Sequence, residues 1–220
     1  MRPCKILTVL AALCALMLTG CATTGRSGYD YSAFRESRPR SIVVLPPLNE
    51  SPDVLATYGV FSQVTFPLAE SGYYVLPVAL VDETFRQNGL TNPGDIHATS
   101  PAKLREIFGA DTALYITVTD YGQRYQVVQS ASIVTASARL LDLKSGQTLW
   151  TGRATASSEE GSRNDSLLAM LLTAVIKQII SSVQDDPSLP IAARTSARLL
   201  SAGHSGGILH GPRSPRYEPD

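Results

Sequence analysis

The spacing of apolar and polar positions divides the chain from residue 41 onward into short strands and helices. Runs rich in β-branched and aromatic side chains predict strands at 41–45, 73–78, 112–119, 126–142 and 148–157. Segments bounded by turn or cap signals predict helices at 54–71, 80–88, 100–109 and 191–202. Gly59 and Pro67 weaken the first of these helices, and a second helical piece can begin at Pro67.

The most regular helical pattern lies at 162–183. Apolar residues recur there with the spacing of one helix face, at Leu168, Leu171, Leu172, Val175, Ile179 and Val183. Four further apolar residues widen that face, namely Leu167, Met170, Ile176 and Ile180. We therefore expect a helix that is covered on most of its circumference.

The order of these elements predicts one α/β layered domain, with a mixed β-sheet flanked by helices, over residues 41–203. A hairpin turn at 143–147 joins two long strands and places Gly146 where a positive φ is needed. Residues 204–220 are rich in Gly and Pro, and we expect a tail there without regular structure.

Residues 1–20 have the pattern of a secretory signal peptide. Arg2 and Lys5 form a basic start, the stretch 6–18 is almost entirely apolar, and small residues follow it. The apolar stretch is shorter than the roughly 20 residues that a bilayer span requires. The pattern thus predicts export of the chain.

The end of this segment, Leu18-Thr19-Gly20-Cys21, resembles the lipobox of bacterial lipoproteins. The resemblance implies cleavage between Gly20 and Cys21, and acylation of Cys21. The alternative is an ordinary signal peptide that contains a cysteine by chance. Ala22 after the cysteine implies, by the sorting rule of enteric-type bacteria, the periplasmic face of the outer membrane.

Residues 21–40 have no apolar periodicity and predict a flexible tether with a reach of roughly 25 Å. Three aromatic residues in it, Tyr29, Tyr31 and Phe34, either pack on the domain or lie at the membrane surface, and packing is the simpler expectation.

Composition narrows the possible functions. Cys4 and Cys14 lie in the signal peptide and Cys21 takes the lipid, so the mature domain has no thiol for a disulfide, a metal or catalysis. Without Arg2 and Lys5, the mature chain has 17 basic against 19 acidic residues. Its charge is near neutral, and we do not expect nucleic acid as a partner.

Segments 42–49, 109–116 and 138–150 together resemble the TolB N-terminal-like domains of periplasmic lipoproteins, a superfamily that includes CsgG and LpoB. The sequences at 72–78 and 211–213 are similar to a family of lipoproteins of unknown function that includes a neisserial surface-antigen candidate. The resemblance implies accessory or assembly work at the envelope and transfers no catalytic residue. CsgG forms a pore, but the resemblance does not imply a pore for this chain, because the sequence has no long hairpins with the alternating pattern of membrane strands.

One short motif suggests catalysis. Gly203-His204-Ser205-Gly206-Gly207 matches the G-x-S-x-G nucleophile elbow, which needs a strand before the serine and a helix after it. Here a predicted helix precedes Ser205, and His210 and Asp220 follow in the wrong order for a triad. A serine hydrolase is therefore the rival hypothesis, and we expect a protein that is not an enzyme.

The remaining polar residues suggest no metal site and no cofactor. We expect His97, His204 and His210 to be solvated loop residues. Adjacent carboxylates point in different directions on a helix or strand, so three such pairs, Asp82-Glu83, Glu159-Glu160 and Asp185-Asp186, do not predict acid–base chemistry.

A possible interaction loop lies at Tyr121, Arg124 and Tyr125, because tyrosine and arginine are enriched at protein interfaces. Ordinary turn residues beside a sheet are the alternative. The sequence as a whole predicts a lipid-anchored, non-catalytic interaction or assembly module that self-associates or binds another envelope protein. Regulation of a peptidoglycan synthase is a third possibility.

Overall fold

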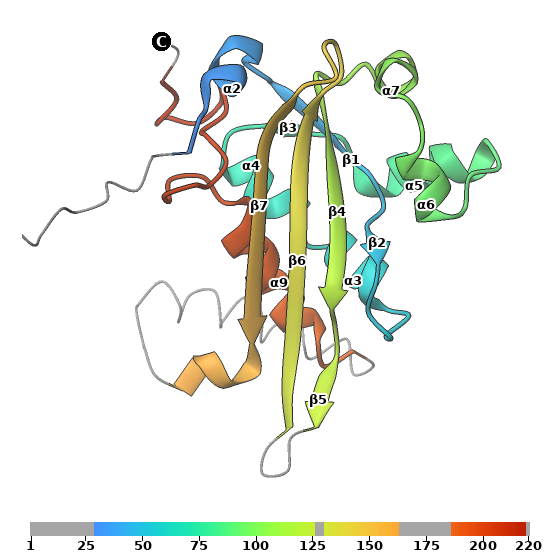
Figure 1. Ribbon diagram of the computed structural model, residues 1–220, viewed down its shortest axis with the longest axis vertical. Coiled ribbons are helices and arrows are strands. Elements are labelled where there is room, and N and C mark those ends of the chain that lie inside the picture. The colour runs from blue at the N-terminus through green and yellow to red at the C-terminus, as the bar shows by residue number, and fades with distance from the viewer. Residues whose placement is uncertain (1–28, 126–129, 163–185, 219–220) are drawn as a thin grey trace, which may run out of the picture.

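The computed structural model describes residues 29–125, 130–162 and 186–218 (Figure 1). Its helices are α2 (Ser32–Ser37), α3 (Ala56–Phe61), α4 (Thr65–Glu70), α5 (Val78–Gln87), α6 (Pro93–His97), α7 (Pro101–Phe108), the 3-10 helix η1 (Ser158–Ser162) and α9 (Leu189–Leu200). Its strands are β1 (Ser41–Val44), β2 (Leu48–Asn49), β3 (Tyr74–Val75), β4 (Thr112–Asp120), β5 (Gln123–Tyr125), β6 (Ser130–Asp142) and β7 (Thr148–Ser157).

The sheet is mixed, as the sequence predicts. β1 lies between β3 and β4 and is parallel to both, and β2 continues along the same side of β4. β4, β6 and β7 form an antiparallel series, and β5 extends the pairing at the start of β6. Among the described strands, β2, β3, β5 and β7 each pair with a single strand, and β7 is the longest of these edge strands.

One face of the sheet carries the larger part of the core. α3, α4 and α9 cover this face, behind β6 and β7 in Figure 1. The buried side chains that meet there include Val44, Leu114, Ile116, Leu140, Trp150 and Leu199. Alternate residues of each strand point to this face, because successive strand side chains alternate in direction.

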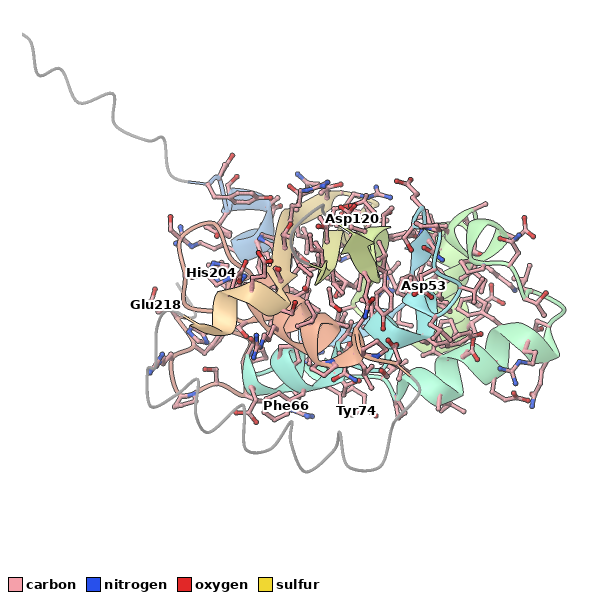
Figure 2. The ribbon with its side chains drawn as sticks, turned by 90° about the horizontal axis from the view of Figure 1, so that it is seen from below. Asp53, Phe66, Tyr74, Asp120, His204 and Glu218 are labelled. Carbon is pink, nitrogen blue, oxygen red and sulfur yellow. The ribbon has the colours of Figure 1, made fainter. Side chains whose placement is uncertain are left out.

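The opposite face is only partly covered. α5, α6 and α7 pack over β1 and the first half of β4, where Val43, Leu45, Phe85, Ile96, Leu104 and Ala113 are buried. The helices do not extend over β6 and β7, which lie in front in Figure 1. Figure 2 looks along the strands and shows Asp120 on this uncovered side, with Phe66 of α4 on the other.

The predicted tether is shorter than expected, because residues 29–40 belong to the domain. Phe34 of α2 is buried in the core, and the Ser37 hydroxyl donates a 2.5 Å hydrogen bond to the Asp142 carboxylate. The Tyr29 hydroxyl accepts a hydrogen bond from the Thr151 N–H at 2.8 Å. Packing of the three aromatic residues on the domain is thus confirmed.

The C-terminal segment also packs on the domain. Its backbone has no helix or strand over residues 201–218, as predicted, but Ile208 is fully buried. The N–H groups of Gly211 and Arg213 donate to the carbonyls of Ser71 and Gly72, at 2.8 and 3.0 Å. The expectation of a separate tail from residue 204 is wrong for this reason.

Most element boundaries follow local signals. Ser100 accepts a hydrogen bond from the Lys103 N–H and begins α7, while Gly109 ends it at a φ of 62°. Gly146 has the predicted positive φ, at 73°. The predicted strand 73–78 is cut to two residues because Pro77 has no N–H for a ladder, and α5 begins directly after it.

The structure differs from the prediction at two helical segments. The segment 54–71 contains two helices, and Pro67 lies in the first turn of α4, where its missing N–H is not needed. α6 is not among the predicted helices, and it begins at Pro93 with Asn92 as its cap. The predicted strand residues 126–129 and helix residues 163–183 lie outside the described residues. Among the described helices, none is both long and apolar enough to span a membrane.

Candidate interaction surface

The predicted interaction loop has a buried residue at its start. Tyr121 follows β4 and is 5% exposed, and its hydroxyl donates a 2.5 Å hydrogen bond to Oδ2 of Asp186. Burial raises the pKa of this hydroxyl, and the Asp186 carboxylate raises it further. Tyr121 is therefore a core residue, and the expectation that it contacts a partner is wrong in this fold.

The close approach of α3 explains how Tyr121 is enclosed. A Cβ at Gly59 would lie within van der Waals overlap of the Tyr121 ring, at 2.2 Å from its hydroxyl oxygen. Only glycine lets the helix backbone lie this near to the ring. Tyr121 thus joins β4, α3 and the residue Asp186 before α9.

The side chains of the other predicted site residues lie outside the described part of the structure. Arg124 and Tyr125 lie in β5, where their backbones pair with Ala131 and Ser130, but their side chains lie outside the described part of the structure. Gly20 and Cys21 lie outside the described residues as well.

Exposed apolar side chains lie next to this loop instead. Val54, Leu55 and Tyr58 are 84%, 47% and 56% exposed, and we name them the α3 ridge. Val54 and Leu55 lie in the turn before α3 and Tyr58 lies in α3, whose residues Ala56, Val60 and Phe61 are buried. Large apolar side chains that gather on a surface are characteristic of interaction sites.

Hydrogen bonds hold the turn that carries the α3 ridge. The Asp53 carboxylate accepts from the Leu55 N–H at 2.9 Å, and the Asn49 side chain donates to the Asp53 carbonyl at 2.8 Å. The Tyr58 hydroxyl lies 3.4 Å from Asp82 of α5. The sequence pattern does not reveal this ridge, because apolar residues in a predicted helix are normally assigned to the core.

The G-x-S-x-G segment forms a structural turn. α9 precedes it, no helix follows it in residues 203–218, and Ser205 is exposed. The Trp150 indole donates to the Gly206 carbonyl at 2.9 Å, and the Tyr31 hydroxyl donates to the Gly207 carbonyl at 2.5 Å. The strand and helix of a nucleophile elbow are thus not found around Ser205.

The histidines are placed differently from one another. His204 is exposed, while His210 is half-buried beside the Ser214 hydroxyl at 3.1 Å. His97 is half-buried, contrary to expectation: its Nε2 donates to the Pro46 carbonyl at 3.0 Å and its ring packs edge-on against Tyr115. Burial lowers the pKa of His97.

The adjacent acidic residues of α5 are engaged with a neighbouring arginine. Asp82 and Glu83 both bind Arg86 on the surface of α5. Within the described ranges, no group of three or more His, Cys, Asp or Glu is placed to hold a metal ion.

The longer sheet edge is partly occupied. On the outer side of β7, the Thr151 N–H donates to Tyr29, and the Thr155 carbonyl accepts from Arg198 at 2.7 Å. These two contacts, within the described structure, interfere with the addition of a further strand along β7.

Comparison with known proteins identifies similar chains. The family model described as "Putative lipoprotein GNA1162-like" matches residues 29–213. The "Putative lipoprotein NMB1124/NMB1162" of Neisseria meningitidis serogroup B is 46% identical over 211 residues, which are 96% of this chain and 98% of the relative. The crystal structure of lipoprotein GNA1162 from Neisseria meningitidis is 53% identical, with a TM-score of 0.54, over 66% of this chain and 100% of that chain.

A weaker structural match is the C-terminal domain of LpoB from Salmonella enterica. It is 19% identical, with a TM-score of 0.38, over 54% of this chain and 82% of that chain. A match at this level transfers no function. The resemblance to a lipoprotein family with a neisserial member, which the sequence indicates, is confirmed by the stronger matches.

Proposed function

Because this chain belongs to the GNA1162-like lipoprotein family, we propose that it is a lipid-anchored, non-catalytic interaction module in a complex of the bacterial envelope. In this proposal, acylated Cys21 holds the domain at the periplasmic face of the outer membrane. The short chain segment 22–28 then separates the lipid from the first described residue of the domain, Tyr29.

The exposed α3 ridge is the observation that carries the proposal. Its three side chains are large and apolar, and they lie on α3 and on the turn directly before it, next to residues of α3 that are buried in the core. A rigid apolar anchor loses little conformational entropy on binding, which favours contact with a protein partner. The ridge offers apolar area for a second envelope protein or for another copy of this chain.

Lipid anchoring would strengthen such a contact. Anchored copies and anchored partners are confined to one plane, which raises their effective concentration. A weak contact through three side chains can then be occupied in the cell although it is barely detectable in solution.

Site-specific crosslinking tests the proposal in intact bacteria. A photo-crosslinking amino acid at position 54 of the full chain should yield a crosslinked product. The same amino acid at Ile107 of α7, which is 40% exposed and remote from α3, serves as the matched control. Leu55→Asp in the position-54 variant should remove the product, because a charge there interrupts the apolar contact.

Expression of two differently tagged copies in the same cell distinguishes self-association from binding to another protein. A product that carries both tags indicates self-association, and a product with one tag indicates another protein. A position-54 yield no greater than that at position 107, or a yield unaffected by Leu55→Asp, would contradict the proposal.

A further inference from the structure

The uncovered face of the sheet carries four polar side chains at neighbouring positions of β6 and β7. Ser137 stands directly opposite Arg153, and Arg139 stands directly opposite Thr151. The two arginines therefore occupy one diagonal of a square and the two hydroxyl residues the other. We name these four residues the Arg–hydroxyl quartet. The alternating residues of β6, Ala136, Ala138 and Leu140, face the core cluster that includes α3, so the quartet lies on the opposite face and is separate from the α3 ridge.

Contacts hold both guanidinium groups in place. The Arg139 guanidinium lies 4.7 Å from the centre of the Tyr115 ring, and that ring packs against His97. The Arg153 guanidinium lies 3.4 Å from the Thr119 hydroxyl. A stacked guanidinium keeps its N–H groups free at the edge, and it loses less freedom on binding than an unrestrained side chain.

The positive charge of the two arginines favours an anionic partner. Both arginines are exposed, and the described structure contains no carboxylate in an ion pair with either of them. The nearest carboxylate belongs to Asp120, which lies beside the quartet because the Thr119 hydroxyl that contacts Arg153 also donates to its Oδ2 at 3.5 Å. A guanidinium binds carboxylates and phosphates through paired N–H donors, and a carboxylate is the anion chosen for the test.

Two features of the surface, its hydroxyl groups and the occupied sheet edge, favour an acidic sugar over an acidic peptide as the anionic partner. A peptide would add along β7 through backbone hydrogen bonds, but Tyr29 and Arg198 occupy groups on that edge. The face itself offers the Ser137 and Thr151 hydroxyls, which can both donate and accept. Tyr29, at the rim beside Thr151, adds an aromatic ring that is 37% exposed.

We propose that the Arg–hydroxyl quartet binds a carboxylate-bearing glycan. Arg139 and Arg153 hold its carboxylates, and Ser137 and Thr151 hydrogen-bond its hydroxyl groups. No pocket is required, because a sugar chain can lie flat across two strands.

Binding of a defined acidic sugar tests this assignment. The probe is a fluorescently labelled oligogalacturonate, and its methyl ester is the matched neutral sugar. Fluorescence anisotropy with the full mature chain in detergent should show binding of the acid and none of the ester. Arg139→Gln and Arg153→Gln should each raise the Kd about tenfold, as expected for one charge-assisted interaction.

Two controls separate this site from general charge attraction. Arg105→Gln removes the same charge from an exposed position on α7 and should leave the Kd within about twofold, since exposed charges at a distance are screened by salt. Polyglutamate of equal charge should bind more weakly than the sugar acid.

Four results would overturn the proposal: no binding of the oligogalacturonate, equal binding of the ester, equal binding of polyglutamate, or an equal loss with Arg105→Gln. Thermal unfolding of each variant verifies that it is folded. None of these results bears on crosslinking at position 54, so this inference and the proposed function can fail separately.

Discussion

The Tyr121 hydroxyl donates a 2.5 Å hydrogen bond to Oδ2 of Asp186, and so joins the end of β4 to the chain just before α9. The other carboxylate oxygen of Asp186 accepts from the Ser188 N–H at 2.9 Å. Asp186 thus fixes the approach to α9 while it holds Tyr121 against Gly59. Three segments that are distant in sequence depend on this one pair.

Removal of the Tyr121 hydroxyl should destabilise the domain. Tyr121→Phe leaves Oδ2 of Asp186 without the tyrosine donor, while Oδ1 keeps the Ser188 N–H, and we expect the free energy of unfolding to fall by about 1–3 kcal/mol. Urea denaturation measures the change. Tyr58→Phe is the control, because its exposed hydroxyl makes only a 3.4 Å contact and its loss should cost less than about 0.5 kcal/mol. Equal effects of the two variants would contradict the role of the pair.

Stability should decline at alkaline pH. Burial raises the pKa of Tyr73 and of Tyr121, and Asp186 raises that of Tyr121 further. An unfolded tyrosine ionises near pH 10, whereas the folded protein keeps both protons to higher pH. The contribution of these residues is therefore complete below about pH 10 and is lost as pH rises beyond it.

The measurement is the free energy of unfolding between about pH 8 and pH 11. Tyr121→Phe removes one titrating group, so its decline above about pH 10 should be shallower than that of the unaltered protein. An identical slope in the two proteins would show that Tyr121 ionises equally in the folded and unfolded chains.

Gly59→Ala should be destabilising because the added Cβ overlaps the Tyr121 ring. We expect a loss of about 1–3 kcal/mol, the usual cost of overpacking, by urea denaturation. In the double variant with Tyr121→Phe, the hydroxyl part of the overlap is absent, so the total loss should be smaller than the sum of the single losses. Strict additivity would mean that the two positions are not in contact.

Local signals account for the parts of the fold that the sequence predicts. The Ser100 cap, the Gly109 stop and the Gly146 turn each depend on residues within a few positions, and each is found in the structure. The alternation of side chains along β4 and β6 likewise needs no distant partner.

Residues whose burial depends on distant segments could not be predicted in this way. Tyr121 follows a strand and precedes a glycine, which is typical of a surface turn, and only the approach of α3 at Gly59 encloses it. Ile208 lies in a Gly- and Pro-rich segment, yet it fills a gap in the core. The α3 ridge is the converse case, since its apolar residues have no covering segment among the described residues.

Ser205→Ala should have no effect on stability or on any phenotype that the protein supports. Its side chain is exposed, and the turn is held by Trp150 and Tyr31 through the carbonyls of Gly206 and Gly207. We expect a change in unfolding free energy within about 0.5 kcal/mol. Stoichiometric labelling of Ser205 by a fluorophosphonate probe would instead support the hydrolase hypothesis.

Cys21→Ala should abolish incorporation of a fatty-acid probe and change membrane fractionation, because the thiol is the proposed lipid attachment site. Cys14→Ala, within the predicted signal peptide, is the matched control and should retain the label. Undiminished labelling of the Cys21 variant would refute the attachment site.

The packing of residues 29–40 on the domain determines how it would bear mechanical load. With a lipid on Cys21, a pulling force from the membrane would first act on the domain at Tyr29, before it reaches the strands of the sheet. The contacts of Tyr29 with Thr151, Tyr31 with Gly207 and Ser37 with Asp142 then lie in series between the anchor and the strands. Shear force would strain these side-chain contacts first, and the backbone ladder of the sheet would remain unloaded until they break.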